Sequence, residues 1–420
     1  MLLFVPSGYN FGPVKMRITI LILLGFFIHN PQTLFSQANN YKQETVNFLG
    51  DTLQLTIDAD MLVDYTEPVS EQSLRSFYNQ VNESDFQPVI NKLFLYREQH
   101  ELSDWLYYQL IRKTAETISP KADNYERYTL YKWFLLTKSG YDAHLALEKN
   151  QLLFYVRSDD NIYDIPLFML NGKQYVCLNF HDFDSRSIDR EKIYTANILV
   201  PEATRAFSYK IDRLPDFETG KADIKKVGFY YGDKLFQYQL FLNPQVGKIF
   251  MNYPVVDFEV YFNVPISRET YASLIPALKR DVKHMNQNNG VEYLMRFTRD
   301  AFSFKNDVEQ FGKEKRLTPE QTLLYGNSDC DDRAALFFYL VKEIYNLPMI
   351  VLLYPEHVTI AVKLDKPVGV PILYRDQKFS VCETTPQGLD LGLGQLPPDL
   401  RKKAYKVVYE YDPLANLTLH

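Results

Sequence analysis

The chain has little of three things that would indicate particular kinds of protein. Its 420 residues include only 3 cysteines, an odd number that excludes a complete disulfide framework and leaves at least one thiol free. There is no long run of Lys and Arg, and 46 basic against 52 acidic residues give a net charge of −6, which argues against a nucleic-acid partner. The sequence lacks a D-x-D-x-D-G calcium loop, so we expect no metal site and no cofactor.

The one apolar run near the N-terminus is too short to span a bilayer. It extends from Ile18 to Ile28, follows Lys15 and Arg17, and precedes a more polar stretch that ends in LFSQANN. This order is typical of a signal peptide. We therefore predict a signal peptide at residues 1–37 and a periplasmic or secreted mature protein without a membrane span; a buried apolar helix is the alternative.

Hydrophobic periodicity predicts three further regions. Residues 38–185 are expected to form a mixed α/β region, with strands at about 41–68 and helices at about 70–118. Residues 186–266 contain the runs FSYKID, KVGFYYG, LFQYQLFL and FEVYFNV between turn signals, which indicate a β-rich, sandwich-like module. Residues 267–420 start helically and carry the candidate chemistry. We expect an α+β protein of several domains.

Cys330 stands where a helix should begin. Ser328 and Asp329 are favourable N-caps, and an apolar segment follows them. A thiol in the first turn of a helix lies at the positive end of the helix dipole, so we expect its pKa to be lowered. The unpaired N–H groups there can stabilise an oxyanion, with Tyr325 or Asn327 as candidates for a further donor.

Two strands should bring a base and an acid to this thiol. MIVLLYP and HVTIAVKL read as neighbouring strands with His357 at the start of the second, and KFSVCETT reads as a third strand that carries Glu383. Nucleophile, base and orienting acid are the three roles that thiol acyl transfer needs. Cys177 and Cys382 lie in apolar strands and are expected to be packing residues.

The acidic residues around the thiol have a simpler interpretation than metal binding. Neighbouring carboxylates at a helix start should point in different directions, and capping and dipole complementarity explain them. We therefore assign no metal to Asp329, Asp331 and Asp332, and expect Asp332 and Arg333 to pair or to brace the turn.

Residues of about 290 to 390 resemble the transglutaminase-like superfamily through GNSDCDDRAALF, YPEHVTIAV and VCETTP. FTRDAFSFKNDVEQFGKEKRLTPEQTLL is also similar to the lead-in of exported members from Bacteroidetes-type bacteria. The resemblance implies a papain-like domain with a helix packed on an antiparallel sheet, in which Cys330 is the nucleophile, His357 the base and Glu383 stands for the usual Asp. It implies a peptidase, an amidase or an acyltransferase that forms a thioester with a peptide or protein amide. The alternative is a non-catalytic protein that uses this scaffold to bind peptide or glycan.

The chain also contains an internal similarity. ERYTLYKWFLLTKSGYDAHLAL, from Glu126, aligns with DRAALFFYLVKEIYNLPMIVLL, from Asp332, with apolar positions largely in step. This indicates either a duplicated helix-plus-sheet unit or a coincidence between two amphipathic helices that each precede a strand. A first copy within residues 38–185 would lack thiol chemistry, because the places of Cys330, His357 and Glu383 are taken by Asn124, Gln151 and Leu178 or Cys177.

Overall fold

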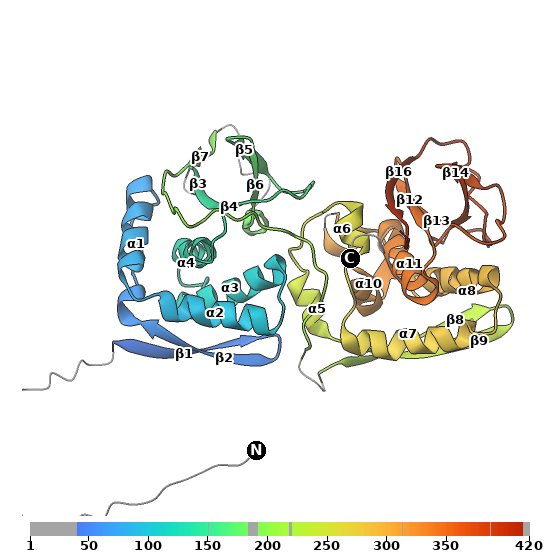
Figure 1. Ribbon diagram of the computed structural model, residues 1–420, viewed down its shortest axis with the longest axis horizontal. Helices are drawn as coiled ribbons and strands as arrows, with labels where there is room; N and C mark the ends of the chain where they lie inside the picture. The colour runs from blue at the N-terminus through green and yellow to red at the C-terminus, as the bar shows by residue number, and fades with distance from the viewer. Residues whose placement is uncertain are drawn as a thin grey trace, which may run out of the picture. The chain divides into compact units, whose positions relative to one another are not determined.

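The computed structural model describes residues 40–149, 151–183, 192–217, 221–312, 314–386 and 388–414. It is a mixed α+β structure, as the sequence predicts (Figure 1), and residues 41–420 group as one compact unit. The predicted signal peptide lies outside the described residues, and the predicted domain boundaries stay predictions. In the described part of the chain, no helix combines the length and the apolar character that crossing a bilayer requires.

The chain begins with a hairpin followed by helices. Strands β1 (Tyr41–Phe48) and β2 (Asp51–Asp58) pair antiparallel, and the alternation in DTLQLTID buries Leu53, Leu55 and Ile57 on one face. After the short 3₁₀ turn η1 (Ala59–Met61), the helices are α1 (Glu71–Glu83), α2 (Gln87–Gln99), α3 (Asp104–Ile118) and α4 (Tyr125–Lys138). The predicted strands are present only as far as Asp58, and the helical stretch predicted from about 70 to 118 is present as the three helices α1, α2 and α3.

A five-stranded antiparallel sheet follows α4. Its strands are β3 (Ala143–Glu148), β4 (Gln151–Arg157), β5 (Leu167–Leu170), β6 (Lys173–Cys177) and β7 (Tyr194–Thr195). They lie in the order β5-β6-β4-β3-β7, and the 3₁₀ turn η2 (Phe180–Asp182) follows β6. Ten of the 14 residues of α4, from Tyr128 to Thr137, are buried without interruption, so most of this helix lies inside the core.

The prediction of a sandwich-like module at residues 186–266 is wrong, because only two of its four expected strands form. KVGFYYG and LFQYQLFL do form strands, β8 (Asp223–Tyr231) and β9 (Lys234–Leu242), but these pair only with each other among the described residues. FEVYFNV instead contains helix α6 (Phe258–Phe262), after helix α5 (Pro244–Ile249). Five residues are too few to separate a period of 2 from one of 3.6, and the Phe258 and Phe262 rings contact each other one helical turn apart.

FSYKID fails as a strand for a different reason. Phe207, Tyr209 and Ile211 are all buried, so the alternation that suggested a strand is real. The segment has no assigned strand, however, and its neighbour Arg205 makes only an isolated bridge to Tyr141. An extended segment can bury alternate side chains without joining a sheet.

The C-terminal part starts with the helices α7 (Arg268–Val282) and α8 (Gln287–Asp300), which cover one face of the β8–β9 hairpin. Asn286 caps α8 and lies between the two helices. Short elements then lead to the candidate site: β10 (Ser303–Phe304), α9 (Asp307–Phe311), α10 (Pro319–Tyr325), β11 (Asn327–Ser328) and the central helix α11 (Cys330–Tyr345).

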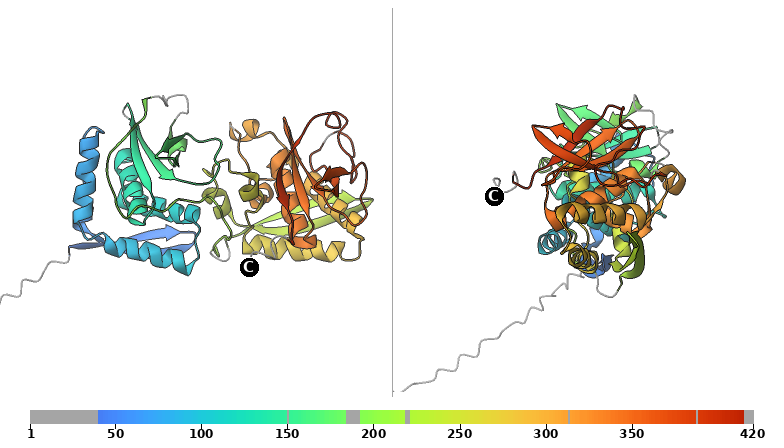
Figure 2. Two further views of the ribbon diagram at one scale, coloured as in Figure 1. Left: turned by 45° about the horizontal axis from the view of Figure 1, so that its top comes forward. Right: turned by 90° about the vertical axis from the view of Figure 1, so that its right-hand side faces the viewer.

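A second five-stranded antiparallel sheet packs on α11 through β13. Its strands are β12 (Met349–Tyr354), β13 (His357–Val362), β14 (Ile372–Tyr374), β15 (Gln377–Cys382) and β16 (Lys406–Tyr411). Figure 2 shows these strands, coloured orange to red, beside the helix. The helix-on-antiparallel-sheet arrangement predicted for this region is therefore present.

The two sheets have the same topology. The second sheet is ordered β14-β15-β13-β12-β16 and the first β5-β6-β4-β3-β7, so each strand matches the one at the same place in chain order. Each sheet also follows a buried helix, α4 or α11. The first half of the chain, up to β7, contains the β1–β2 hairpin, and the second half, from β8 on, contains the β8–β9 hairpin. A duplicated unit would produce this correspondence.

Candidate active site

The first turn of α11 lies where the sequence predicts it. The helix begins at Cys330 and ends before Asn346, which adopts the left-handed conformation at φ 51°. The Asp332 carboxylate fixes the incoming chain: Oδ1 accepts hydrogen bonds from the Leu317 N–H at 2.7 Å and the Tyr261 hydroxyl at 3.2 Å. Its Oδ2 accepts from the Asp329 N–H at 3.4 Å. Asp332 therefore positions the turn that carries the thiol.

Arg333 braces the same turn through backbone carbonyls. Its side chain is fully buried, and the guanidinium donates to the carbonyls of Thr298, Arg299, Phe302 and Ser328 at 2.6–3.5 Å. The expected bracing is thus present, but Asp332 and Arg333 form no ion pair with each other. Asp332 instead accepts hydrogen bonds from three other residues, and Arg333 donates to four backbone carbonyls. Rigid support of this kind holds a nucleophile in place.

His357 and Glu383, which the sequence predicts to be a base and its orienting acid, contact each other, while their catalytic roles stay a prediction. His357 opens β13, Glu383 follows the last residue of β15, and these strands are neighbours. The distance from His357 Nε2 to Glu383 Oε2 is 2.8 Å, and Glu383 is 0% exposed. The other carboxylate oxygen accepts from the Thr385 N–H at 2.9 Å. Since a carboxylate only accepts, Nε2 carries the proton, and Nδ1 is left as the basic nitrogen.

The Cys330 thiol lies beside the strand that carries His357. A backbone hydrogen bond from Val358, the next residue, lowers the thiol pKa, but burial and then the charges of Asp331 and Asp329 raise it above its ordinary value. The expectation of a lowered pKa is therefore wrong: the helix start is favourable, but desolvation and like charges outweigh it. No hydrogen bond joins the thiol to the His357 ring, both of which are described residues, so their pairing stays a prediction.

Carboxyl groups crowd this end of the helix. One ligand atom each of Asp329, Cys330 and Asp331 lies within 4.8 Å of the others, and the same holds for Asp307, Glu314 and Asp329. The expectation that neighbouring carboxylates diverge is therefore wrong for Asp329 and Asp331. Carboxylate oxygens at this spacing are also suitable ligands for a hard cation.

Two residues of this acidic region carry no sequence motif. Asp307 is 2% exposed, and burial raises its pKa to about 7. Arg316 supplies a countercharge, with its Nε 3.4 Å from Asp331 Oδ2. Asp307 is the first residue of α9, and Arg316 lies between α9 and α10. A lone Asp and a lone Arg at such positions are ordinary surface residues by sequence, so only the tertiary structure identifies them.

The predicted oxyanion donors do not reach the thiol through a hydrogen bond. A Cβ placed on Gly247 of α5 would lie 3.3 Å from the Tyr325 hydroxyl, so that hydroxyl faces α5. Asn327 lies in β11 and pairs with Ser303 of β10. The N–H groups in the first turn of α11 are then the better candidates for binding an oxyanion.

The other two cysteines are packing residues, as predicted. Cys177 and Cys382 are buried at the ends of β6 and β15, and none of the three cysteines forms a disulfide. In the first half, α4 begins at Tyr125 with Asn124 as its N-cap, so the structural counterpart of Cys330 is one residue later than the sequence alignment gives. Tyr125 accepts a hydrogen bond from Asn179 at 2.8 Å, and this end of α4 carries no thiol.

Neither the family models nor the curated proteins contain a match to this chain.

Proposed function

We propose that this protein is an exported cysteine-dependent amide-bond hydrolase or acyltransferase of the transglutaminase-like type. The observation that carries the proposal is the His357–Glu383 pair, joined at 2.8 Å with the carboxylate fully buried. Burying a carboxylate costs free energy unless the group is hydrogen-bonded. The hydrogen bond to the imidazole offsets this cost and also orients the ring. The position of Cys330 at a helix start beside β13 supports the assignment of the nucleophile.

In the proposed mechanism the thiol is neutral before reaction, because burial and nearby carboxylates raise its pKa. His357 Nδ1 takes the thiol proton as Cys330 Sγ bonds to the carbonyl carbon of a peptide or protein amide. The tetrahedral oxyanion is stabilised by N–H groups of the first turn of α11. His357 then returns the proton to the leaving amine, and the C–N bond breaks to leave a thioester. Water releases an acid and makes the protein a peptidase or amidase; an amine releases a new amide and makes it a transferase.

A non-catalytic binding protein is the second candidate. Two observations favour it: the pKa of the thiol is raised, and no hydrogen bond links the thiol to the imidazole among the described residues. On this proposal the His357–Glu383 pair only stabilises the end of the sheet, and the domain binds peptide or glycan as a scaffold.

Alkylation by iodoacetamide separates the two candidates. The buried Cys177 and Cys382 leave Cys330 as the accessible thiol, and peptide mapping confirms the labelled position. We expect His357→Ala to slow labelling at pH 7 by roughly tenfold or more, because the base is removed. The exposed His284 provides a matched control, and His284→Ala should leave the rate unchanged. Equal rates in wild type and His357→Ala over the whole pH range would favour the scaffold.

A further inference from the structure

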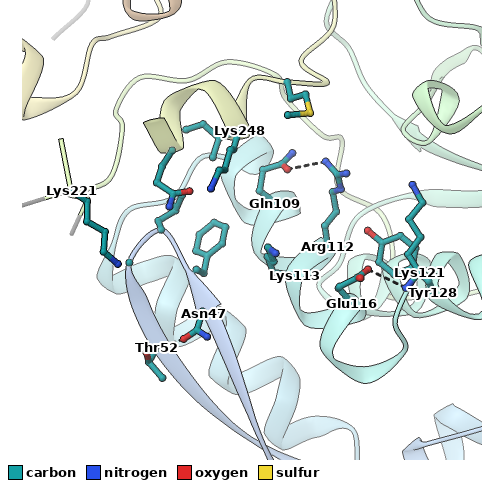
Figure 3. Close-up of a pocket in the computed structure, with 16 residues that line it drawn as sticks. Asn47, Thr52, Gln109, Arg112, Lys113, Glu116, Lys121, Tyr128, Lys221 and Lys248 are labelled. Carbon is teal, nitrogen blue, oxygen red and sulfur yellow. Dashed lines mark hydrogen bonds between the residues drawn. The ribbon is translucent and has the colours of Figure 1, made fainter. Parts of the chain in front are cut away.

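A large pocket formed by β1, β2, α3 and α5 has five basic side chains among its sixteen lining residues. Its volume is about 890 Å³, and it opens among the β1–β2 turn, α3 and α5 (Figure 3). This size is in the range of pockets for small organic ligands. The basic lining residues are Arg112, Lys113, Lys121, Lys221 and Lys248, against a single acidic one, Glu116. The pocket is therefore strongly positive in a chain whose net charge is −6.

The described carboxylates neutralise little of this charge. Lys121 forms an ion pair with Asp182 at 2.5 Å, and Glu116 accepts from the Lys121 backbone N–H at 3.2 Å. Lys113 and Lys248 are exposed and make no ion pair with a described residue. A ligand that enters the pocket thus meets cations that remain available for it.

The inner wall adds to the positive charge. Arg112 donates to Gln109 Oε1 at 3.0 Å, which is a neutral partner. Behind it, Lys132 is buried, with its Nζ 4.3 Å from the centre of the Tyr128 ring. Burial, and then the charges of Arg112 and Lys121, lower the pKa of Lys132 to about 7, against the opposing effect of Asp182. An anion in the pocket would relieve this repulsion.

The donors approach from more than one wall. Arg112 and Lys113 come from α3, Lys248 comes from α5, and the ends of β1 and β2 add the polar groups of Asn47 and Thr52. Figure 3 shows the Lys248 side chain directed from its helix toward α3. A phosphate group presents three acceptor oxygens and up to two negative charges, so it can use donors from several directions. A carboxylate is planar and is satisfied by one fork of donors.

We propose that this pocket binds a small organic ligand that carries phosphate groups. The site is separate from Cys330 and does not depend on the function proposed above. The phosphates of the ligand would lie between Lys113 of α3 and Lys248 of α5 and would also contact Arg112.

Calorimetric titration of the whole mature chain with inorganic pyrophosphate tests the proposal. We expect saturable binding at one site, weaker at 200 mM than at 50 mM salt, as charge-assisted contacts require. The variant Lys113→Gln/Lys248→Gln changes only exposed side chains and should weaken binding about tenfold or more. Arg112→Gln should weaken it as well, provided that its melting temperature shows a folded protein.

Three controls give the proposal a clear failure. Lys279→Gln/Arg280→Gln removes the same charge from an exposed part of α7 and should bind pyrophosphate like wild type. Citrate, a tricarboxylate, should bind at least tenfold more weakly. Cys330→Ala should bind normally, which keeps this result independent of thiol chemistry. No saturable binding, an equal loss in the α7 control, or equally tight binding of citrate would each overturn the assignment.

Discussion

Replacement of Glu383 by Gln tests the proposed base most sharply, because the two side chains have the same shape. Both oxygens of the carboxylate are in use: Oε2 lies 2.8 Å from His357 Nε2, and Oε1 accepts from the Thr385 N–H at 2.9 Å. A Gln amide has one acceptor oxygen and an NH₂ group that can only donate. If the oxygen stays on Thr385, the NH₂ faces Nε2. The imidazole then shifts its proton to Nδ1, which can no longer accept a proton from the thiol.

The size of the effect follows from the same contacts. A hydrogen bond to a charged group contributes about 1.5–3 kcal/mol, which corresponds to a factor of roughly 10 to 150. We expect Glu383→Gln to slow iodoacetamide labelling of Cys330 at pH 7 by at least the lower of these factors. If the wrong tautomer removes the base entirely, the rate should equal that of His357→Ala. The double variant should then show no further loss, because the two residues act as one unit.

Glu356→Gln is the matched control. Glu356 precedes His357 and is exposed, so this change removes the same charge next to the imidazole without touching its hydrogen bond. Its labelling rate should stay within about twofold of wild type, since exposed charges are screened. The reasoning is refuted if Glu383→Gln labels at the wild-type rate while remaining folded. It is also refuted if the losses from Glu383→Gln and His357→Ala multiply.

Three further changes probe the acidic end of α11 and its support. After burial, Asp331 is the largest contributor to the raised pKa of the Cys330 thiol. Asp331→Asn should therefore lower this pKa and speed the labelling of Cys330 at pH 7 roughly several-fold. The pH–rate profile of labelling should shift to lower pH. Arg333→Leu leaves buried carbonyls without donors and should cost about 3–5 kcal/mol in urea unfolding, against about 0.5 kcal/mol for the exposed Arg280→Leu. Burial raises the pKa of Asp307 to about 7 from 3.8, so the folded state binds this proton more tightly and loses stability as pH rises through that window. Asp307→Asn should therefore raise the melting temperature at pH 8 but hardly change it at pH 4, and an equal change at both pH values would contradict this sign.

The sequence predicts the helix and strands of the candidate site well, because each has a clear local cause. Asp329 caps α11, Asn346 ends it, and the alternation in HVTIAVKL and KFSVCETT leads to neighbouring strands. The His357–Glu383 contact follows from that strand pairing. These are short-range patterns of capping and alternation, which a local stretch of sequence contains in full.

The failures come from properties that only the assembled fold has. The raised pKa of Cys330 depends on its burial and on the carboxylates around it, which no helix-dipole argument contains. FEVYFNV forms a helix because its aromatic residues pack against α11, a tertiary contact that overrides its strand-like composition. Asp307, at the start of α9, joins the acidic region through a chain path that the sequence does not reveal.

The brace at Arg333 also affects which substitutions the protein can tolerate. All four acceptors of its guanidinium are main-chain carbonyls, in Thr298, Arg299, Phe302 and Ser328. Every amino acid has such a carbonyl, so the brace places no requirement on side-chain identity at those positions. Within this brace only Arg333 is therefore required for its side chain, and the four partner positions can change as far as packing permits.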